Sequence, residues 1–134
     1  MTVTINASTS SGIVATADGS GILKVQSNGV TTNALAWVNF AGASGTINAA
    51  YNVSSVTRTA TGTYTVTFTN ALSNANYCPC FSVRQGGTRF ETAIVGSASV
   101  PSTTAFIILT GISMYGVDNY FFDESVVTAT VFGN

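Results

Sequence analysis

The chain has 134 residues, a net charge of −1, 7% charged residues and no histidine. This length suits a single domain, and the near-neutral charge excludes the basic surface that holds nucleic-acid phosphates. The missing histidine removes the usual general base and most zinc sites, and no run of about 20 apolar residues suits a membrane span. We therefore expect a protein that is not an enzyme, has no cofactor, and binds neither nucleic acid nor membrane.

Uncharged side chains supply the polarity that charges usually provide. The chain holds 21 Thr, 15 Ser and 11 Asn, together with 13 Gly. Threonine favours strands, because its branched Cβ suits a pleated surface, whereas Ser, Asn and Gly favour turns. Because so few charges make a poor solubility shell for a monomer, we expect part of the surface to be buried against other subunits.

The first 33 residues differ from the rest of the chain. They contain two turn dipeptides, Asp18-Gly19 and Asn28-Gly29, and too few large apolar residues to hold a core. Residues 1–10 have neither a positive start nor a long apolar run, so we expect no secretory signal and assembly in a cytoplasm. We predict an extended β arm over residues 1–33 for attachment and trimerisation, and its expected partner contacts are Val3, Ile5, Ile13, Ile22, Leu23 and Val25.

Short runs with a period of two fill residues 34–134. In Thr63–Thr69, the residues Tyr64, Val66 and Phe68 alternate with threonines, which predicts a half-buried strand. Further strands are predicted over Ala36–Phe40, Thr46–Val53, Tyr77–Arg84, Ala105–Thr110 and Val126–Phe132.

Two local features refine this expectation. Pro79 cannot donate to a ladder, so its strand is expected at a sheet edge or at a bulge. The Gln85-Gly86-Gly87 segment predicts a hairpin turn into Thr88–Val95. The fold expected for residues 34–134 is all-β: an antiparallel, jelly-roll-like β-sandwich, which we expect to be homotrimeric.

Aromatic residues mark two places where the chain can meet another molecule. Trp37, the only tryptophan, can stack on a sugar or anchor a core or a subunit interface. We expect the anchor, with Phe40 beside it at an oligomer interface. Residues 111–125 form an aromatic-rich loop, in which Tyr115, Asp118 and Tyr120 are candidate glycan contacts.

For the cysteines and the carboxylates near the end of the chain, we expect structural roles. Cys78 and Cys80 lack the further ligands that a tetrahedral zinc site needs, so inert thiols are expected. Asp118, Asp123 and Glu124 lie close enough in sequence to hold Ca²⁺, and two carboxylates such as Asp118 and Asp123 can act as a hydrolytic pair. Without an Asp-x-Asp-x-Asp-Gly loop, turn chemistry and solvated charge are the expectation, and no metal site is predicted.

Four motifs in order make a family resemblance visible. The motifs are Ala36–Phe40 (AWVNF), Ala50–Val56 (AYNVSSV), Thr61–Phe68 (TGTYTVTF) and Asn74–Tyr77 (NANY). In these motifs the chain resembles a module of tailed-phage virion proteins, found especially in C-terminal regions of tail fibres from phages of aquatic bacteria. The similarity covers roughly residues 10–80.

The resemblance implies a virion surface protein, usually trimeric and without enzyme activity. Its partners would be further copies of itself and other virion proteins, and its place the particle surface. With only about 35 residues before the first motif, a capsid decoration or short tail-fibre-like protein fits better than a complete tail fibre. The alternative is a carbohydrate-binding receptor-recognition module at the tail tip, which would contact a host surface glycan.

Overall fold

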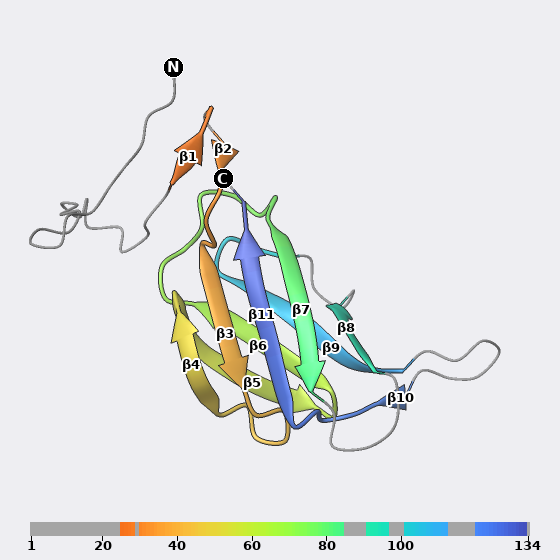
Figure 1. Ribbon diagram of the computed structural model, residues 1–134. Coiled ribbons are helices and arrows are strands. Elements are labelled where there is room, and N and C mark those ends of the chain that lie inside the picture. The colour runs from red at the N-terminus through yellow and green to blue at the C-terminus, as the bar shows by residue number, and fades with distance from the viewer. Residues whose placement is uncertain (1–24, 29, 85–90, 97–100, 113–119, 134) are drawn as a thin grey trace, which may run out of the picture.

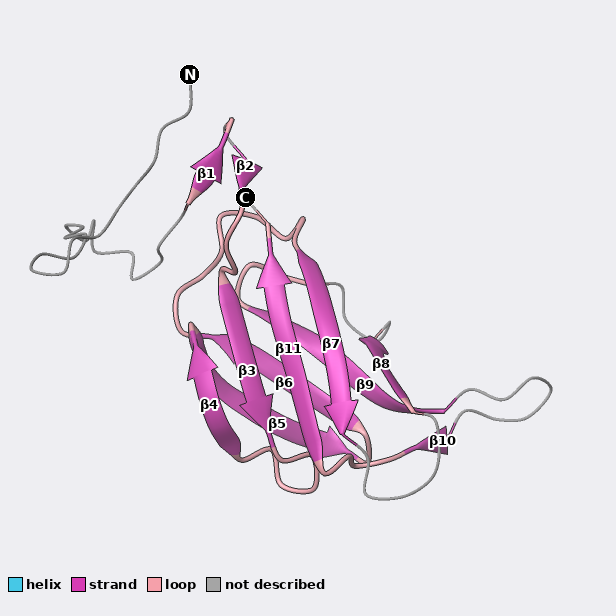
Figure 2. Ribbon diagram, in the orientation of Figure 1, coloured by secondary structure: helices cyan, strands magenta, loops and turns pink. Residues whose placement is uncertain are grey.

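The chain folds into two antiparallel sheets packed face to face, with strands and loops and no helix in the part of the chain that is described (Figures 1 and 2). This computed structural model describes residues 25–28, 30–84, 91–96, 101–112 and 120–133. The expectation of an all-β antiparallel sandwich is therefore confirmed.

The nine strands from β3 onward form the two larger sheets. The strands are β1 Gln26–Ser27, β2 Val30–Thr31, β3 Ala36–Phe40, β4 Ile47–Tyr51, β5 Val53–Ala60, β6 Thr63–Phe68, β7 Cys78–Arg84, β8 Thr92–Val95, β9 Ala105–Ile112, β10 Tyr120–Phe121 and β11 Val126–Phe132. One sheet has the order β4-β3-β11-β7 and the other β10-β9-β6-β5, with β8 also paired to β9.

The strand order differs from the jelly-roll-like expectation. Four sequential pairs, β3–β4, β5–β6, β8–β9 and β9–β10, are each hydrogen-bonded neighbours in the same sheet, whereas consecutive strands of a jelly roll mostly alternate between the sheets. The physical reason is local: short turns such as Thr61-Gly62, where Gly62 has φ 62°, return the chain directly beside the strand it has left.

The core lies between the inner faces of the two sheets. Tyr64, Val66 and Phe68 are at most 5% exposed, which confirms the face predicted from their alternation with threonine. Phe40 from the opposite sheet packs against Tyr64, with ring centroids 5.0 Å apart at 65°. Among the described residues, the buried apolar side chains of the core lie between Leu35 and Val131.

A corner at Asn52 corrects one predicted strand. Thr46–Val53 was expected to be continuous, but β4 ends at Tyr51, and β5 starts at Val53 in the other sheet. Asn52 has φ 53°, a conformation that asparagine tolerates better than most residues. Its amide donates to the carbonyls of Leu35 and Asn70, both at 3.2 Å, and accepts from the Asn70 N–H at 2.8 Å. One side chain thus fixes the passage between sheets.

The predicted hairpin after β7 is also wrong. β7 pairs with β11, and β8 pairs with β9 in the other sheet, so the two strands are not hydrogen-bonded neighbours. The turn residues Gln85–Gly87 lie outside the described residues. The expectation for Pro79 is confirmed, since β7 is an edge strand.

Before β3, a small hairpin of β1 and β2 forms a sheet of its own (Figure 1). It is closed by hydrogen bonds from the Thr32 N–H to the Val25 carbonyl at 2.7 Å, and from the Val25 N–H to the Asn33 side chain at 2.6 Å. Val25 itself is exposed. The other predicted arm contacts, Val3, Ile5, Ile13, Ile22 and Leu23, lie outside the described residues.

Candidate interaction surfaces

The solvent-facing side of the four-stranded sheet, here called the outer sheet face, carries exposed aromatic residues. Antiparallel register places Trp37 directly between Tyr51 and Thr130, and Cys80 follows Thr130 in the same row across the strands. Directly opposed side chains have Cβ atoms about 5 Å apart. Trp37 is 39% exposed, so it forms, with Tyr51, a pair of neighbouring rings on an open surface.

The next row of the outer sheet face consists of short, mostly polar side chains. It contains Ala49, Asn39, Thr128 and Ser82 in register. A β-bulge between Asn39 and Phe40 leaves Asn48 as an extra residue on β4, and bulges re-aim side chains in this way. The Asn48 amide donates to the Asn39 side-chain oxygen at 2.8 Å. The bulge therefore builds an amide pair beside the two rings.

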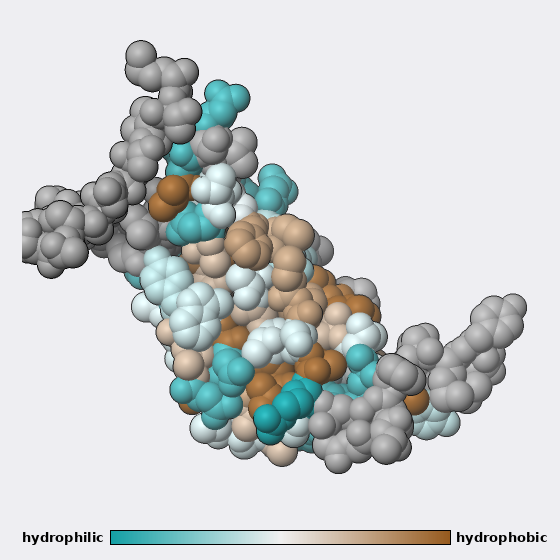
Figure 3. Space-filling view, in the orientation of Figure 1, coloured by the Kyte–Doolittle hydropathy of each residue, from teal (hydrophilic) through white to brown (hydrophobic). Residues whose placement is uncertain are grey.

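Charge is nearly absent from this face. Arg84, at the end of β7, is the only charged residue in the four strands. Figure 3 views this face and shows tan and pale residues over its middle, with teal and brown residues side by side toward its lower end. Phe132 and the free, exposed Cys78 are register partners at one end of this face. The other end holds the amide pair and Arg84, so the outer sheet face carries one charged strand residue, away from Trp37.

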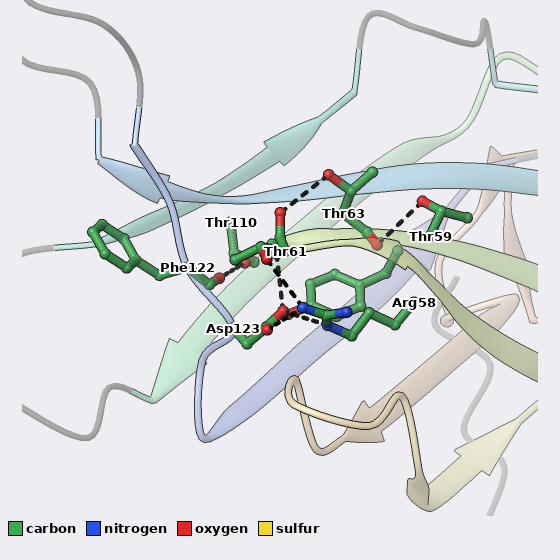
Figure 4. A network of polar contacts seen from close by, with 9 residues as sticks. Arg58, Thr59, Thr61, Thr63, Thr110, Phe122 and Asp123 are labelled. Atoms are coloured by element: carbon green, nitrogen blue, oxygen red, sulfur yellow. Dashed lines mark hydrogen bonds and ion pairs between the residues drawn. The ribbon is translucent and has the colours of Figure 1, made fainter.

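A second feature is a polar network at one end of the sandwich, here called the Asp123 latch, made of Asp123, Arg58, Gly62 and Tyr64. The Asp123 carboxylate accepts from Arg58 Nε at 2.9 Å and Nη2 at 2.6 Å, and also from the Gly62 N–H and the Tyr64 hydroxyl, each at 2.9 Å (Figure 4). Bidentate Arg–carboxylate pairs are among the strongest hydrogen-bonded pairs. The latch fastens the segment before β11 to β5 and β6.

Backbone contacts extend the Asp123 latch along the same segment. The Thr110 hydroxyl donates to the Phe122 carbonyl at 2.6 Å, and the Phe122 N–H donates to the Thr110 carbonyl at 3.1 Å. Beyond the latch, the Gly42 N–H donates to the carbonyl of the buried Glu124 at 3.1 Å. The path of residues 122–124 is therefore fixed from both sheets.

The Asp123 latch also sets the protonation of its members. Hydrogen bonding by Arg58, together with that of Gly62 and Tyr64, lowers the pKa of Asp123 from 3.8 to about 2. Burial is the main cause that raises the pKa of Tyr64, and the hydrogen bond to Asp123 raises the pKa of Arg58. Asp123 is therefore ionised, and Tyr64 is a neutral donor, at neutral pH.

This network corrects the expectation for the carboxylates near the end of the chain. Asp123 was expected to be a turn residue or a solvated charge, yet its side chain is 20% exposed and hydrogen-bonded on both oxygens. Glu124, expected to be solvated as well, is 2% exposed. The third carboxylate, Asp118, lies outside the described residues.

The structure separates the two residues predicted for an oligomer interface. Trp37 lies on the outer sheet face, where another molecule can reach it. Phe40 is 0% exposed, because residues at odd and even positions of β3 point to opposite faces. Its assignment to an interface is wrong: the side chain belongs to the core of its own chain.

Of the predicted glycan contacts, only Tyr120 falls on described residues, and Tyr115 and Asp118 do not. Tyr120 is 47% exposed on β10, beside the exposed Phe121. Sequence reasoning missed the residues that hold this strand in place, Arg58 above all. A pair separated by 65 residues in the chain leaves no local pattern in the sequence.

Within the described ranges, no three His, Cys, Asp or Glu side chains cluster as a metal site would require. Nor is any described helix long and apolar enough to cross a membrane. No protein-family model matches the chain, and neither a curated protein nor a solved structure shows significant similarity to it. The functional argument therefore depends on the residues themselves.

Proposed function

We propose that the chain is a non-enzymatic surface protein of a phage particle. In this proposal residues 1–33 attach the protein to another virion protein and hold three copies together. Residues 34–134 form the displayed sandwich, as a capsid decoration (cement) protein or as a short tail-fibre-like protein. Assembly takes place in the bacterial cytoplasm, and the finished protein resides on the virion.

The position of the core is the observation that carries this proposal. Among the described residues, the buried apolar side chains lie between Leu35 and Val131, and the two sheets that enclose them begin at β3. The β1–β2 hairpin forms a separate sheet. We infer that the segment before β3 serves attachment, since extended segments commonly bind by adding strands to exposed edges of a partner.

Composition and family resemblance support the same proposal. A chain with 7% charged residues suits an assembly in which neighbouring subunits cover part of each surface. The four motifs that resemble phage virion modules fall on β3, the β4–β5 corner, the turn and strand of β6, and the approach to β7. They therefore build the framework of the sandwich.

Deletion of residues 1–33 tests the proposal. We expect the full chain to have three times the 13.7 kDa mass of one copy, and the 34–134 fragment to be monomeric. The fragment should keep a cooperative thermal transition, because its core is intact, and should lose binding to purified particles. Light scattering, circular dichroism and co-sedimentation provide the readouts.

Two results would contradict the proposal. A fragment that remains trimeric would place the subunit contact in the sandwich, and one that still decorates particles would remove the attachment role from the arm. Cryo-electron microscopy of the particle then distinguishes threefold density on the capsid from density at the tail tip.

A carbohydrate-binding receptor-recognition module is the second candidate. Tyr120 and Phe121, which are 47% and 43% exposed, favour it, because the pairing of β10 with β9 holds these two exposed rings at the edge of the sheet. If this candidate is correct, Tyr120→Ala should reduce binding of the protein to host cells several-fold without changing its melting temperature. Unchanged cell binding would exclude this position.

A further inference from the structure

We propose that the outer sheet face, centred on Trp37 and Tyr51, is a binding platform for neutral polysaccharide. The inference goes beyond the particle-protein role and does not depend on it, since it uses only residues of the sandwich. It also places the sugar site away from β10, on the face of the other sheet.

The two rings supply the apolar half of such a site. Trp37 and Tyr51 are direct register neighbours on β3 and β4, so their side chains lie about 5 Å apart at Cβ. One face of a pyranose ring presents C–H groups, which pack favourably against an aromatic surface. Two aromatic residues at neighbouring positions on an open sheet face suit an extended chain of sugars better than a single compact ligand.

The amide pair supplies the polar half. Asn48 donates to Asn39 at 2.8 Å, and this bond uses one donor of Asn48 and one acceptor of Asn39. The remaining amide donor of Asn39 and the carbonyl oxygen of Asn48 suit sugar hydroxyls, which both donate and accept. Ligand sites typically combine an apolar surface with a few placed polar groups, and here the bulge puts those groups one row from Trp37.

The charge of the face favours a neutral sugar over an acidic one, and its area favours a sugar over a second copy of the chain. Arg84 is the only charged residue in the four strands, and it lies two strands across and four residues along from Trp37, or about 16 Å away. At physiological ionic strength this exceeds the screening length of about 8 Å, so no charge within the four strands pairs with an acidic sugar at the rings. The face measures about 20 Å on each side from strand spacing and rise, or about 400 Å². A stable protein interface buries about 800 Å² on each partner, so this face alone is too small for a second copy.

An open platform that covers one side of a sugar chain binds weakly, and we expect a dissociation constant on the order of 0.1–1 mM for one site. Several copies on one particle would increase the apparent affinity by a factor of about 100 or more. A weak site of this kind is useful to a protein that is displayed in many copies.

Trp37 is the only tryptophan in the chain, so its fluorescence reports directly on the platform. The experiment titrates the full chain with cellohexaose, mannohexaose and maltohexaose, and with hexagalacturonate as the acidic comparison. We expect at least one neutral hexasaccharide to shift the emission to shorter wavelength in a saturable way, and the acidic one to bind at least fivefold more weakly. No saturable shift with any neutral sugar overturns the proposal.

Two variants locate the site. Tyr51→Ala should weaken binding at least fivefold, whereas Tyr120→Ala, which removes an exposed ring at the β10 position, should leave it unchanged. If Tyr120→Ala weakens binding and Tyr51→Ala does not, the sugar binds at β10 and the proposal is overturned. An emission shift that follows protein concentration in the absence of sugar, with a matching increase in mass, shows that a second copy occupies the face and overturns it as well.

Blocking the outer sheet face with a chemical label tests the site without removing an aromatic side chain. Cys80 lies in the same row as Trp37, two strands away, or about 10 Å. In the Cys78→Ser variant, a bulky maleimide on Cys80 should abolish the sugar-dependent emission shift while the melting temperature stays within the range of the unlabelled variant. Full binding by the labelled protein overturns the proposal.

Discussion

Phe40→Ala will lower the free energy of unfolding by about 4 kcal/mol, because it removes a large, fully buried ring and leaves a cavity. The ring packs edge-on against Tyr64 from the opposite sheet, so its loss also loosens a member of the Asp123 latch. Urea denaturation of the full chain, followed by circular dichroism, measures the effect.

Trp37→Ala provides the matched control on the same strand. Trp37 lies three residues before Phe40 and points to the other face, so its removal should cost about 1 kcal/mol. Equal costs for the two variants would contradict the assignment of their faces. A midpoint for the native chain that rises with protein concentration, and that no longer does so in Trp37→Ala, would indicate that Trp37 lies between subunits.

Local pattern predicted most of the strands and failed where the chain changes sheets. The alternation in Thr63–Phe68 is strong, because one face is fully buried and the other consists of threonine. Asn52 interrupts no alternation, since Tyr51 and Val53 on either side of it both read as strand residues. Its positive φ and its bonds to Leu35 and Asn70 depend on residues 17 and 18 positions away, which periodicity does not report.

The candidate surfaces, too, were predictable from the sequence only where local alternation determines them. The exposure of Trp37 follows from the alternation in β3, which also contradicts an interface role for Phe40 and was available in the sequence. The pairing of Trp37 with Tyr51 depends on register, and the aim of Asn48 depends on a bulge. Register and bulges are properties of the paired strands, so the sequence predicts the residue types but not their arrangement.

The Asp123 latch depends entirely on tertiary structure, and its largest expected effect is on stability. Asp123→Asn keeps the shape of the side chain but removes the charge that Arg58 faces. Lowering of the Asp123 pKa from 3.8 to about 2 corresponds to about 2 kcal/mol of stability at neutral pH. We expect a loss of about this size at pH 7, measured by urea denaturation.

The pH dependence gives this prediction a sign that can be checked. Because the folded-state pKa is lower than the unfolded value, the stabilisation is fully present above about pH 4 and is lost as the pH falls through about 2. Native protein and Asp123→Asn should therefore differ at pH 7 and converge near pH 2. A constant difference over this range would show that the carboxylate charge contributes nothing.

Two arginine variants separate the latch from a general effect of charge. Arg58→Met should destabilise the protein at pH 7, because it leaves a partly buried carboxylate without its main partner. Arg84→Met, at the exposed end of β7, should change stability by at most about 0.5 kcal/mol. In the double variant Arg58→Met/Asp123→Asn the costs should be less than additive, since each change removes the same interaction. Full additivity would mean that the two side chains do not stabilise the fold as a pair, and that the contacts of Thr110 and Gly42 hold residues 122–124 without them.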